Sequence, residues 1–416
     1  MSGSIPETFS PASDRCDTLQ GSGSGPEIGD GVMAEQVHTG NKDPGAGLVI
    51  TRLETIPILA PLARDFRGSH YHMTQRATLI TRVHTADGIV GEAYAGDEDV
   101  TLLSIEQIVR DEIAPRLVGL DALATERCWE AGYPATFDIL RDRRLALVAL
   151  ASVDAAVWDA VGKALNQPLW RLWGGYRNRV PLIAIGGYYG EPLGSIAEEI
   201  GFYKAQGLAG IKFKVGGRSP AEDAERVAAT REAAGPEFVI AIDANQGYTV
   251  PQALDLCERI KGYDIRWFEE PVRWENDRRS LRDVRMRGGI PVCAGQSEFS
   301  PAGCRDLMEL GAIDVCNFDA SWSGGPTVWR RNAAVAYTYD VEVGHHEEPQ
   351  LSAHLVASQP HGTFAECFHP DRDPFFWNLI ANRPPLDAGE LVLSNRPGLG
   401  WDLDWDYVER YRVRPE

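Results

Sequence analysis

The chain has 416 residues, of which 44% are hydrophobic, and a formal net charge of −19 at pH 7. This length allows two or three domains, and the hydrophobic share is enough for a sizeable core. The excess of acidic residues argues against nucleic acid or anionic membrane as the main partner. It does not argue against an acidic small molecule, because a local cluster of lysines and a metal ion can override the global charge.

The sequence shows no transmembrane or secretory pattern. It contains no run of 18 apolar residues, and the N-terminus lacks a basic region followed by an apolar segment. The seven scattered cysteines are typical of reduced thiols rather than of a disulfide framework. We therefore expect a cytoplasmic protein without a membrane partner.

The N-terminal part divides into a tail and a mixed domain. Residues 1–47 are rich in Gly, Ser, Pro and acidic residues, which predicts a disordered tail. Residues 48–178 are expected to form an α+β domain, because strand patterns come first and helical patterns follow. The strands are predicted over 49–56, 77–83 and 89–94, and the helices over 100–115, 122–135 and 145–164.

A polar, aromatic and cationic loop is predicted between the first two strands, over residues 63–72. Arg67, His70 and Tyr71 in this loop are candidates for binding an anionic substrate under a lid. A solvated hairpin loop without a binding role is the alternative.

Strand and helix patterns then alternate regularly. This alternation predicts a (β/α)-type barrel over residues 179–384, and residues 385–416 are expected to pack back on the first domain. Its eight strands are predicted over 181–187, 210–216, 238–244, 266–270, 291–295, 313–319, 340–345 and 363–367.

Charged residues follow three neighbouring barrel strands. Lys212 and Lys214 lie two apart, so both point to the same side of their strand, where Asp243 and Glu269 also arrive. Two lysines facing two carboxylates indicate a cation held by oxygen ligands, with an amine beside it. Such a site suits removal of a proton next to a carboxylate. Asn245 either supports this site or belongs to a turn.

With these motifs in order, the chain resembles the mandelate racemase subgroup of the enolase superfamily from residue 48 onward. The resemblance implies an α+β capping domain over a modified (β/α)7β barrel, with Mg²⁺ as cofactor and an enolate intermediate. It also implies that loops of the capping domain select the substrate. The residues that match the family's strand-end motifs are Lys212, Lys214, Asp243, Glu269, Asp319, His346 and Glu366.

The fifth barrel strand departs from the family pattern. The family usually ends this strand with Gly-Glu, whereas Gly295 is followed here by Gln296, and Glu298 comes two residues later. Because a hard cation prefers a carboxylate, we expect Glu298 to be the third metal ligand rather than Gln296.

The resemblance also suggests roles in proton transfer. Lys214 is expected to be one base, with its pKa lowered by burial beside Lys212. His346, held by Asp319, is expected to be the acid or base on the opposite face, and Glu366 would contact the substrate carboxylate. The alternatives are rim lysines that merely pair with carboxylates and a structural histidine.

The leading hypothesis is a Mg²⁺-dependent lyase that dehydrates an acid sugar, an aldonate or aldarate. A racemase or epimerase of a 2-hydroxy acid would use the same two groups. A non-catalytic metal-binding barrel and an aldolase that forms a Schiff base on Lys214 are further alternatives. We expect a small-molecule carboxylate as the ligand and a homo-oligomer as the assembly.

Overall fold

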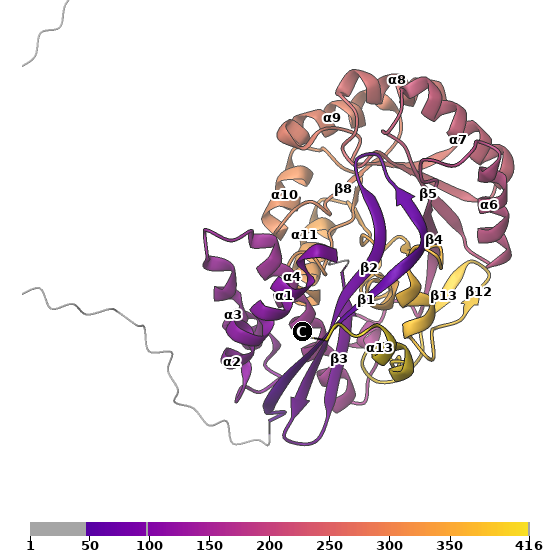
Figure 1. Cartoon of the computed structure of the whole chain (residues 1–416). Coiled ribbons are helices and arrows are strands. Elements are labelled where there is room, and N and C mark those ends of the chain that lie inside the picture. The colour runs from indigo at the N-terminus through magenta and orange to yellow at the C-terminus, as the bar shows by residue number, and fades with distance from the viewer. Residues whose placement is uncertain (1–46, 97–98, 415–416) are drawn as a thin grey trace, which may run out of the picture. The chain divides into compact units, whose positions relative to one another are not determined.

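The computed structural model describes residues 47–96 and 99–414 (Figure 1). The predicted disordered tail, residues 1–47, lies outside the described residues apart from Gly47.

An antiparallel three-stranded sheet opens the described chain, in the order β1-β2-β3. Its strands are β1 (Ile50–Arg67), β2 (His72–Thr85) and β3 (Val90–Ala95). The first two strands are longer than predicted, because the alternation of buried and exposed residues in β1 continues through Ile58 and Ala60. The expected loop over 63–72 is therefore the end of a long hairpin, whose turn covers residues 68–71.

Helices cover this sheet, and the longest of them, α4, packs against β3 and β2. Among the described helices, α4 alone is long and apolar enough to cross a membrane, but 89% of its apolar window is buried inside the protein. Burial of this kind is typical of the core helix of a globular fold. The segments are η1 (Asp99–Thr101), α1 (Leu102–Ile108), η2 (Val109–Ile113), α2 (Ala114–Leu117), α3 (Thr125–Gly132), η3 (Tyr133–Phe137), α4 (Arg143–Ala164) and α5 (Leu169–Leu172).

Eight parallel strands then form a barrel, and each overlaps its predicted range, with strand ends that differ from the prediction by at most three residues. The strands are β4 (Arg179–Gly186), β5 (Gly210–Lys214), β6 (Val239–Asp243), β7 (Ile265–Glu269), β8 (Val292–Ala294), β9 (Val315–Cys316), β10 (Glu342–Val343) and β11 (Ala365–Phe368). Each neighbours the next in the order β4 to β10, and β11 pairs in parallel with β4. A parallel bridge between Val343 and Gly362 joins the remaining edge.

Seven helices connect these strands, which gives the expected (β/α)7β order. They are α6 (Ser195–Ala205), α7 (Pro220–Ala234), α8 (Val250–Ile260), α9 (Asp277–Gly288), α10 (Pro301–Glu309), α11 (Pro326–Thr338) and α12 (Pro349–Ser358), with the short η4 (Trp274–Asn276) before α9. Sequence signals explain their starts, since a capping box at Ser219 begins α7 and another at Thr249 begins α8.

The barrel interior is a packed core rather than a pore. One cluster of buried side chains is drawn from five strands: Ile183, Ala241, Trp267, Cys293 and Val315. Trp267 also donates its indole N–H to Glu269 Oε2 at 3.2 Å. This apolar layer therefore ends directly beneath the charged residues at the barrel mouth.

The chain that follows β11 contacts both the barrel and the first sheet. It contains η5 (Phe375–Leu379), β12 (Leu386–Asp387), β13 (Glu390–Val392) and α13 (Trp405–Tyr411). The strand β13 pairs antiparallel with β4, and the Val413 amide donates to Pro57 O at 2.9 Å. The contact with the first sheet agrees with the expected packing, while the domain boundaries themselves stay a prediction.

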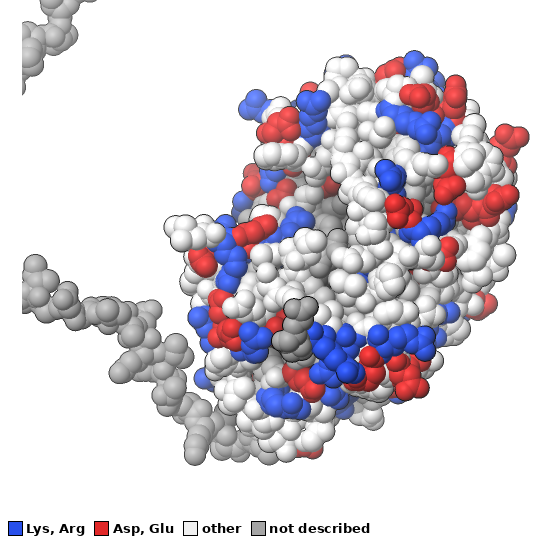
Figure 2. Space-filling view, viewed as in Figure 1, with Lys and Arg blue, Asp and Glu red and all other residues white. Residues whose placement is uncertain are grey.

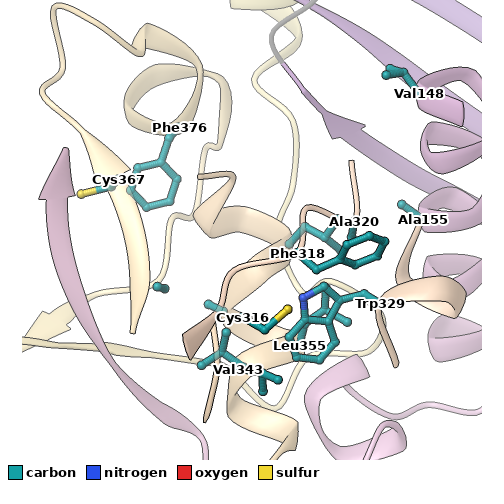
Figure 3. Close-up of a cluster of buried hydrophobic side chains, with 14 of the residues drawn as sticks. Val148, Ala155, Cys316, Phe318, Ala320, Trp329, Val343, Leu355, Cys367 and Phe376 are labelled. Atoms are coloured by element: carbon teal, nitrogen blue, oxygen red, sulfur yellow. The ribbon is translucent and has the colours of Figure 1, made fainter. Parts of the chain in front are cut away.

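The helix α4 also packs against the barrel. Val148 and Ala155 of α4 belong to one buried cluster with Phe318 and Trp329 (Figure 3). Asp154 of α4 accepts hydrogen bonds from the amide and hydroxyl of Thr327 at the start of α11, both at 2.8 Å. The cluster thus gives the α+β part and the barrel a shared core.

Charges of both signs are interspersed over the face shown in Figure 2, with uncharged residues between them. The net charge of −19 is therefore not gathered into one acidic patch on this face.

Candidate active site

The ends of β5, β6 and β7 bring the first four predicted residues together. Lys214, Asp243 and Glu269 lie in register on adjacent strands. Lys214 Nζ lies 2.7 Å from Asp243 Oδ2, and Lys212 Nζ lies 2.7 Å from Glu269 Oε1. All four side chains are buried, so these ion pairs lie in an environment that favours strong charge compensation.

Glu366 of β11 completes this cluster, since its Oε1 lies 2.8 Å from Lys212 Nζ. Three carboxylates thus face two lysines, which leaves one negative charge in excess when all five groups are ionised. Burial, together with the charges of Asp243 and Glu366, raises the pKa of Glu269 to about 8 although Lys212 opposes the shift. A cluster of this kind is suited to receive a cation.

The pKa expected for Lys214 differs from the one that the structure gives. Burial on its own would lower the pKa of this lysine, but the contact with Asp243 raises it above the usual value. The lowered pKa was expected from Lys212 as the neighbouring charge, whereas the structure shows the pairing with a carboxylate that was given as the alternative. In this arrangement the pairing with Asp243 favours the protonated form of Lys214.

Asp319 and His346 form the expected pair. Asp319 follows β9 and His346 follows β10, and His346 Nδ1 lies 2.9 Å from Asp319 Oδ2. Asp319 Oδ1 also accepts the amide and hydroxyl hydrogens of Ser321 at 2.7 and 2.6 Å. These bonds fix the carboxylate and through it the orientation of the imidazole.

Glu347, which directly follows His346 in the sequence, is a further part of this site. Its Oε1 lies 3.1 Å from His346 Nε2, so the ring lies between two carboxylates. Burial on its own would lower the pKa of His346, but Glu347 and Asp319 raise it well above the usual value. The two carboxylates therefore favour the protonated form of the imidazole. The sequence shows that Glu347 is next to His346. It does not show the backbone conformation that brings their side chains into contact.

The hairpin turn reaches the barrel mouth with different residues from those expected. Ser69 Oγ donates to Ala244 O at 3.1 Å, and the Tyr71 ring centre lies 5.6 Å from Lys214 Nζ. Arg67, by contrast, is 59% exposed and lies 3.8 Å from Asp65, and His70 is exposed. The structure thus brings Tyr71 into the site and leaves the side chains of Arg67 and His70 on the outer surface.

Two further aromatic residues line the mouth without a sequence signal. The Tyr188 hydroxyl, just after β4, is buried and has no hydrogen-bond partner among the described residues. Burial raises the pKa of Tyr188, with Tyr71 adding to the shift and Lys214 opposing it, so this phenol lies on the Lys214 side. The Trp322 ring centre lies 4.7 Å from that of His346.

The expectation that Glu298 is the third metal ligand is contradicted. Both of its carboxylate oxygens accept bonds from Arg278 Nη2 of α9, at 2.9 and 3.0 Å. The Glu298 amide donates to Gly295 O at 3.0 Å, so the chain turns after β8 and the side chain faces the helices outside the barrel. Gln296 is buried instead, and its Oε1 accepts from Asn317 Nδ2 at 2.9 Å.

Glu270 also lies differently from what strand alternation implies, which would turn it away from Glu269. Its φ of 36° ends the strand geometry, and its side chain is buried. Ser297 Oγ donates to Glu270 Oε1 at 2.6 Å. Burial raises the pKa of Glu270 and Asp243 adds to the shift, which puts Glu270 beside the strand-end cluster.

The residues present fit a magnesium ion. Within residues 47–96 and 99–414, no three His, Cys, Asp or Glu side chains gather as a complete metal cage. Mg²⁺ does not need such a cage, because it is commonly bound through one or two carboxylates, with water and substrate completing an octahedron. Asp243 and Glu269 supply two carboxylates. Asn245, whose Nδ2 donates to Asp243 Oδ2 at 3.2 Å, adds a buried Oδ1 that accepts no bond from the described residues.

Both halves of this arrangement match known sequence families. The model of the mandelate racemase/muconate lactonizing enzyme N-terminal domain matches residues 54–174, and that of the enolase C-terminal domain-like family matches residues 195–407. The chain belongs to the mandelate racemase/muconate lactonizing enzyme family. Membership confirms both the resemblance drawn from the strand-end motifs and the capped (β/α)7β fold.

Several proteins of this family are similar over nearly the whole length. Arabinonate dehydratase from Saccharolobus solfataricus is 30% identical over 344 residues, which are 80% of this chain and 90% of that protein. A mandelate racemase/muconate lactonizing enzyme from a marine actinobacterium, solved in complex with magnesium, is 67% identical, with a TM-score of 0.85 over 88% of this chain and 100% of that one. A racemase from Streptomyces coelicolor A3(2), solved with bound magnesium, is 27% identical, with a TM-score of 0.82 over the same shares.

Proposed function

We propose that this protein catalyses the Mg²⁺-dependent dehydration of an acid sugar, an aldonate or aldarate. The α-proton and the β-hydroxyl are lost, and the resulting enol becomes a 2-keto-3-deoxy acid. The observation that supports the proposal is the presence of buried Lys214 and carboxylate-paired His346 at the mouth that also holds the carboxylates of Asp243, Glu269 and Glu366. The similarity to an arabinonate dehydratase supports dehydration.

Asp243 and Glu269 would hold Mg²⁺, with the amide oxygen of Asn245 or Gln296 as a neutral donor. When bound, Mg²⁺ supplies positive charge that stabilises the charge developing on the substrate carboxylate. Lys212 adds a fixed cation on the same side, because Glu269 and Glu366 hold its Nζ at 2.7 and 2.8 Å. A substrate with an ionised carboxylate is therefore the ligand that this end of the mouth suits.

Lys214 is proposed to take the α-proton. Its amine lies at the strand end and under the Tyr71 ring, at 5.6 Å from the ring centre, so it is shielded from bulk water. The amine accepts a proton once Asp243 no longer pairs with it, since burial on its own lowers the pKa of a lysine. The pair of electrons from the broken C–H bond delocalises into the substrate carboxylate as an enolate, and it forms the double bond between the α- and β-carbons when the β-hydroxyl leaves.

His346 is proposed to protonate the departing β-hydroxyl. Asp319 and Glu347 flank its two ring nitrogens, which keeps the ring protonated before reaction. The ring donates the Nε2 proton to the hydroxyl as the carbon–oxygen bond breaks, and water leaves. One proton is gained by lysine and one is lost by histidine, so exchange with solvent restores both groups.

A racemase or epimerase of a 2-hydroxy acid is the second candidate. It is favoured by the same observation of two proton-carrying groups at different strands of one mouth, and by the similarity to a racemase from Streptomyces coelicolor A3(2). In that reaction each group removes a proton from one epimer, and no hydroxyl is lost.

A screen of acid-sugar stereoisomers with Mg²⁺ tests the proposal, with the 2-keto-3-deoxy product detected as its semicarbazone. The Asp243→Asn variant should fold, yet lose activity by a factor on the order of 10²–10³, because it removes a charge that stabilises the transition state. The same screen with EDTA should be inactive. If the protein interconverts epimers and forms no keto product, the dehydratase proposal is wrong and the protein is a racemase or epimerase.

A further inference from the structure

A fully buried arginine joins the N-terminal sheet to the loop that carries His346. Arg76 lies on β2, and its side chain is 0% exposed. Its Nη2 lies 2.7 Å from Glu348 Oε1, and its Nε lies 3.3 Å from Asp373 Oδ1. Both acceptors belong to the barrel side, because Glu348 follows β10 and Asp373 follows β11. A buried guanidinium is costly unless carboxylates compensate it, so these contacts hold β2 against the barrel loops.

The loop between β10 and α12 has an unusual backbone. Glu347 and Glu348 both adopt left-handed conformations, with φ of 58° and 52°. Residues other than glycine avoid this region unless their surroundings enforce it. The Glu347 amide donates to Glu366 Oε2 at 3.0 Å. The two oxygens of Glu348 accept from Arg76 and from Gln350 Nε2, both at 2.7 Å.

We propose that Arg76 is a positioning residue, which acts through Glu348 and Glu347 to hold the His346 imidazole at the barrel mouth. The inference rests on the proposed function, since it concerns the same histidine. Glu347 contacts Nε2 of the ring, the nitrogen on the side opposite to Asp319. That contact requires the left-handed turn, and Arg76 holds the turn at its second residue. The N-terminal sheet therefore contributes to the site in two ways. Its hairpin turn reaches the barrel mouth, and its Arg76 holds in place the loop that carries His346, the proposed acid.

The test compares three variants of the full chain. Arg76→Met removes the buried charge, and Arg76→Lys keeps it but can satisfy one carboxylate rather than two. Arg82→Met is the matched control, because Arg82 lies on the same strand and also has two carboxylate partners, Glu92 at 2.8 Å and Glu54 at 3.0 Å. Those partners belong to the N-terminal sheet itself and not to the barrel.

Two measurements are made on each variant. The first is peptide-level hydrogen exchange over residues 344–352, and the second is kcat and KM with an acid sugar that the wild-type protein dehydrates. In Arg76→Met the exchange of this segment should be faster by about tenfold or more, while that of the barrel strands stays unchanged. Its kcat should fall by about 10–100-fold with KM changed less than about threefold, because a general acid contributes in the transition state. Arg76→Lys should recover part of the kcat, and Arg82→Met should match the wild type.

Unchanged exchange over 344–352 with unchanged kcat in Arg76→Met would overturn the inference. An increase in exchange spread evenly over the protein would overturn it as well, because it would indicate a role in overall stability. Should Arg76→Met fail to fold, the double variant Arg76→Met/Glu348→Gln removes the buried cation and one of its two carboxylate partners, and it should show the same loss of kcat. If the wild-type protein dehydrates no acid sugar, the proposed function fails, and the exchange comparison still decides whether Arg76 holds the loop.

Discussion

Replacing His346 by asparagine is the sharpest test of how the two proton-carrying groups divide the reaction. The change removes the ring that lies 2.9 Å from Asp319 and 3.1 Å from Glu347. Asp319 Oδ1 keeps its bonds from the amide and hydroxyl of Ser321, so the charge-assisted hydrogen bond at Asp319 Oδ2 and the contact with Glu347 Oε1 are lost. Such a bond contributes about 1.5–3 kcal/mol, and the variant should therefore stay folded with a Tm lower by a few degrees, on the order of the shifts expected for a large domain.

The loss of activity should be larger than the loss of stability implies. A positioned general acid contributes about 10²–10⁴-fold to a rate, so dehydration by His346→Asn should fall by that range. Exchange of the substrate α-proton with solvent, followed by proton NMR in D₂O, should persist because Lys214 removes that proton. His361→Asn is the matched control, since His361 contacts Ala333 O at 3.1 Å outside the site, and it should retain wild-type rates.

Loss of exchange together with dehydration would refute this division of roles. It would mean that His346 takes the α-proton itself and that Lys214 has another task, such as binding the substrate carboxylate.

Three further predictions concern the third ligand, the hairpin and pH. Gln296→Ala should weaken Mg²⁺ binding, measured by calorimetry, by about tenfold or more. Glu298→Gln should have little effect, because both carboxylate oxygens of Glu298 accept hydrogen bonds from Arg278. A larger effect of Glu298→Gln would show that Glu298 is the ligand. Tyr71→Ala should lower kcat/KM by about tenfold, in line with its cation–π contact with Lys214. Arg67→Ala should change kcat/KM less than about twofold, because Arg67 is exposed. Equal effects of the two variants would argue against Tyr71 as the hairpin residue that reaches the site. Burial raises the pKa of Asp154 to about 7, above an unfolded value of about 3.9, so its stabilising contribution is complete below pH of about 4 and is lost as pH rises to 7. The free energy of unfolding of Asp154→Asn relative to wild type should therefore rise by about 2–3 kcal/mol between pH 5 and pH 8 in urea titrations, and a pH-independent difference would contradict the shift.

The sequence determined the barrel and most of its charged mouth. Lys214, Asp243 and Glu269 each end a strand-length apolar run. In a parallel barrel the C-terminal ends of the strands meet at one edge, so these three residues are predicted to lie together there. The two-residue spacing of Lys212 and Lys214 then puts both on the same side. Local patterns of this kind need no tertiary information, and the structure brings all four groups within ion-pair distance.

Tertiary contacts decided the details in which local patterns misled. Because the chain turns after Gly295, Glu298 pairs with Arg278, which lies 20 positions earlier in the chain. No local sequence preference encodes that partner. The pKa of Lys214 depends on which neighbour is nearest, and Asp243 is 29 positions away. The length of the hairpin arms likewise put Tyr71 rather than Arg67 at the barrel mouth.

The same distinction explains the loop of Glu347 and Glu348. Two consecutive left-handed glutamates are disfavoured by the local chain, so sequence preferences point to an ordinary loop there. Arg76, on a strand 272 positions earlier, reverses that preference through its bond to Glu348. The sequence by itself thus determined which charged residues of β5, β6 and β7 reach the barrel mouth, since strand periodicity is local. The tertiary structure decided which of them contact one another, because buried charges select partners by distance in space rather than along the chain.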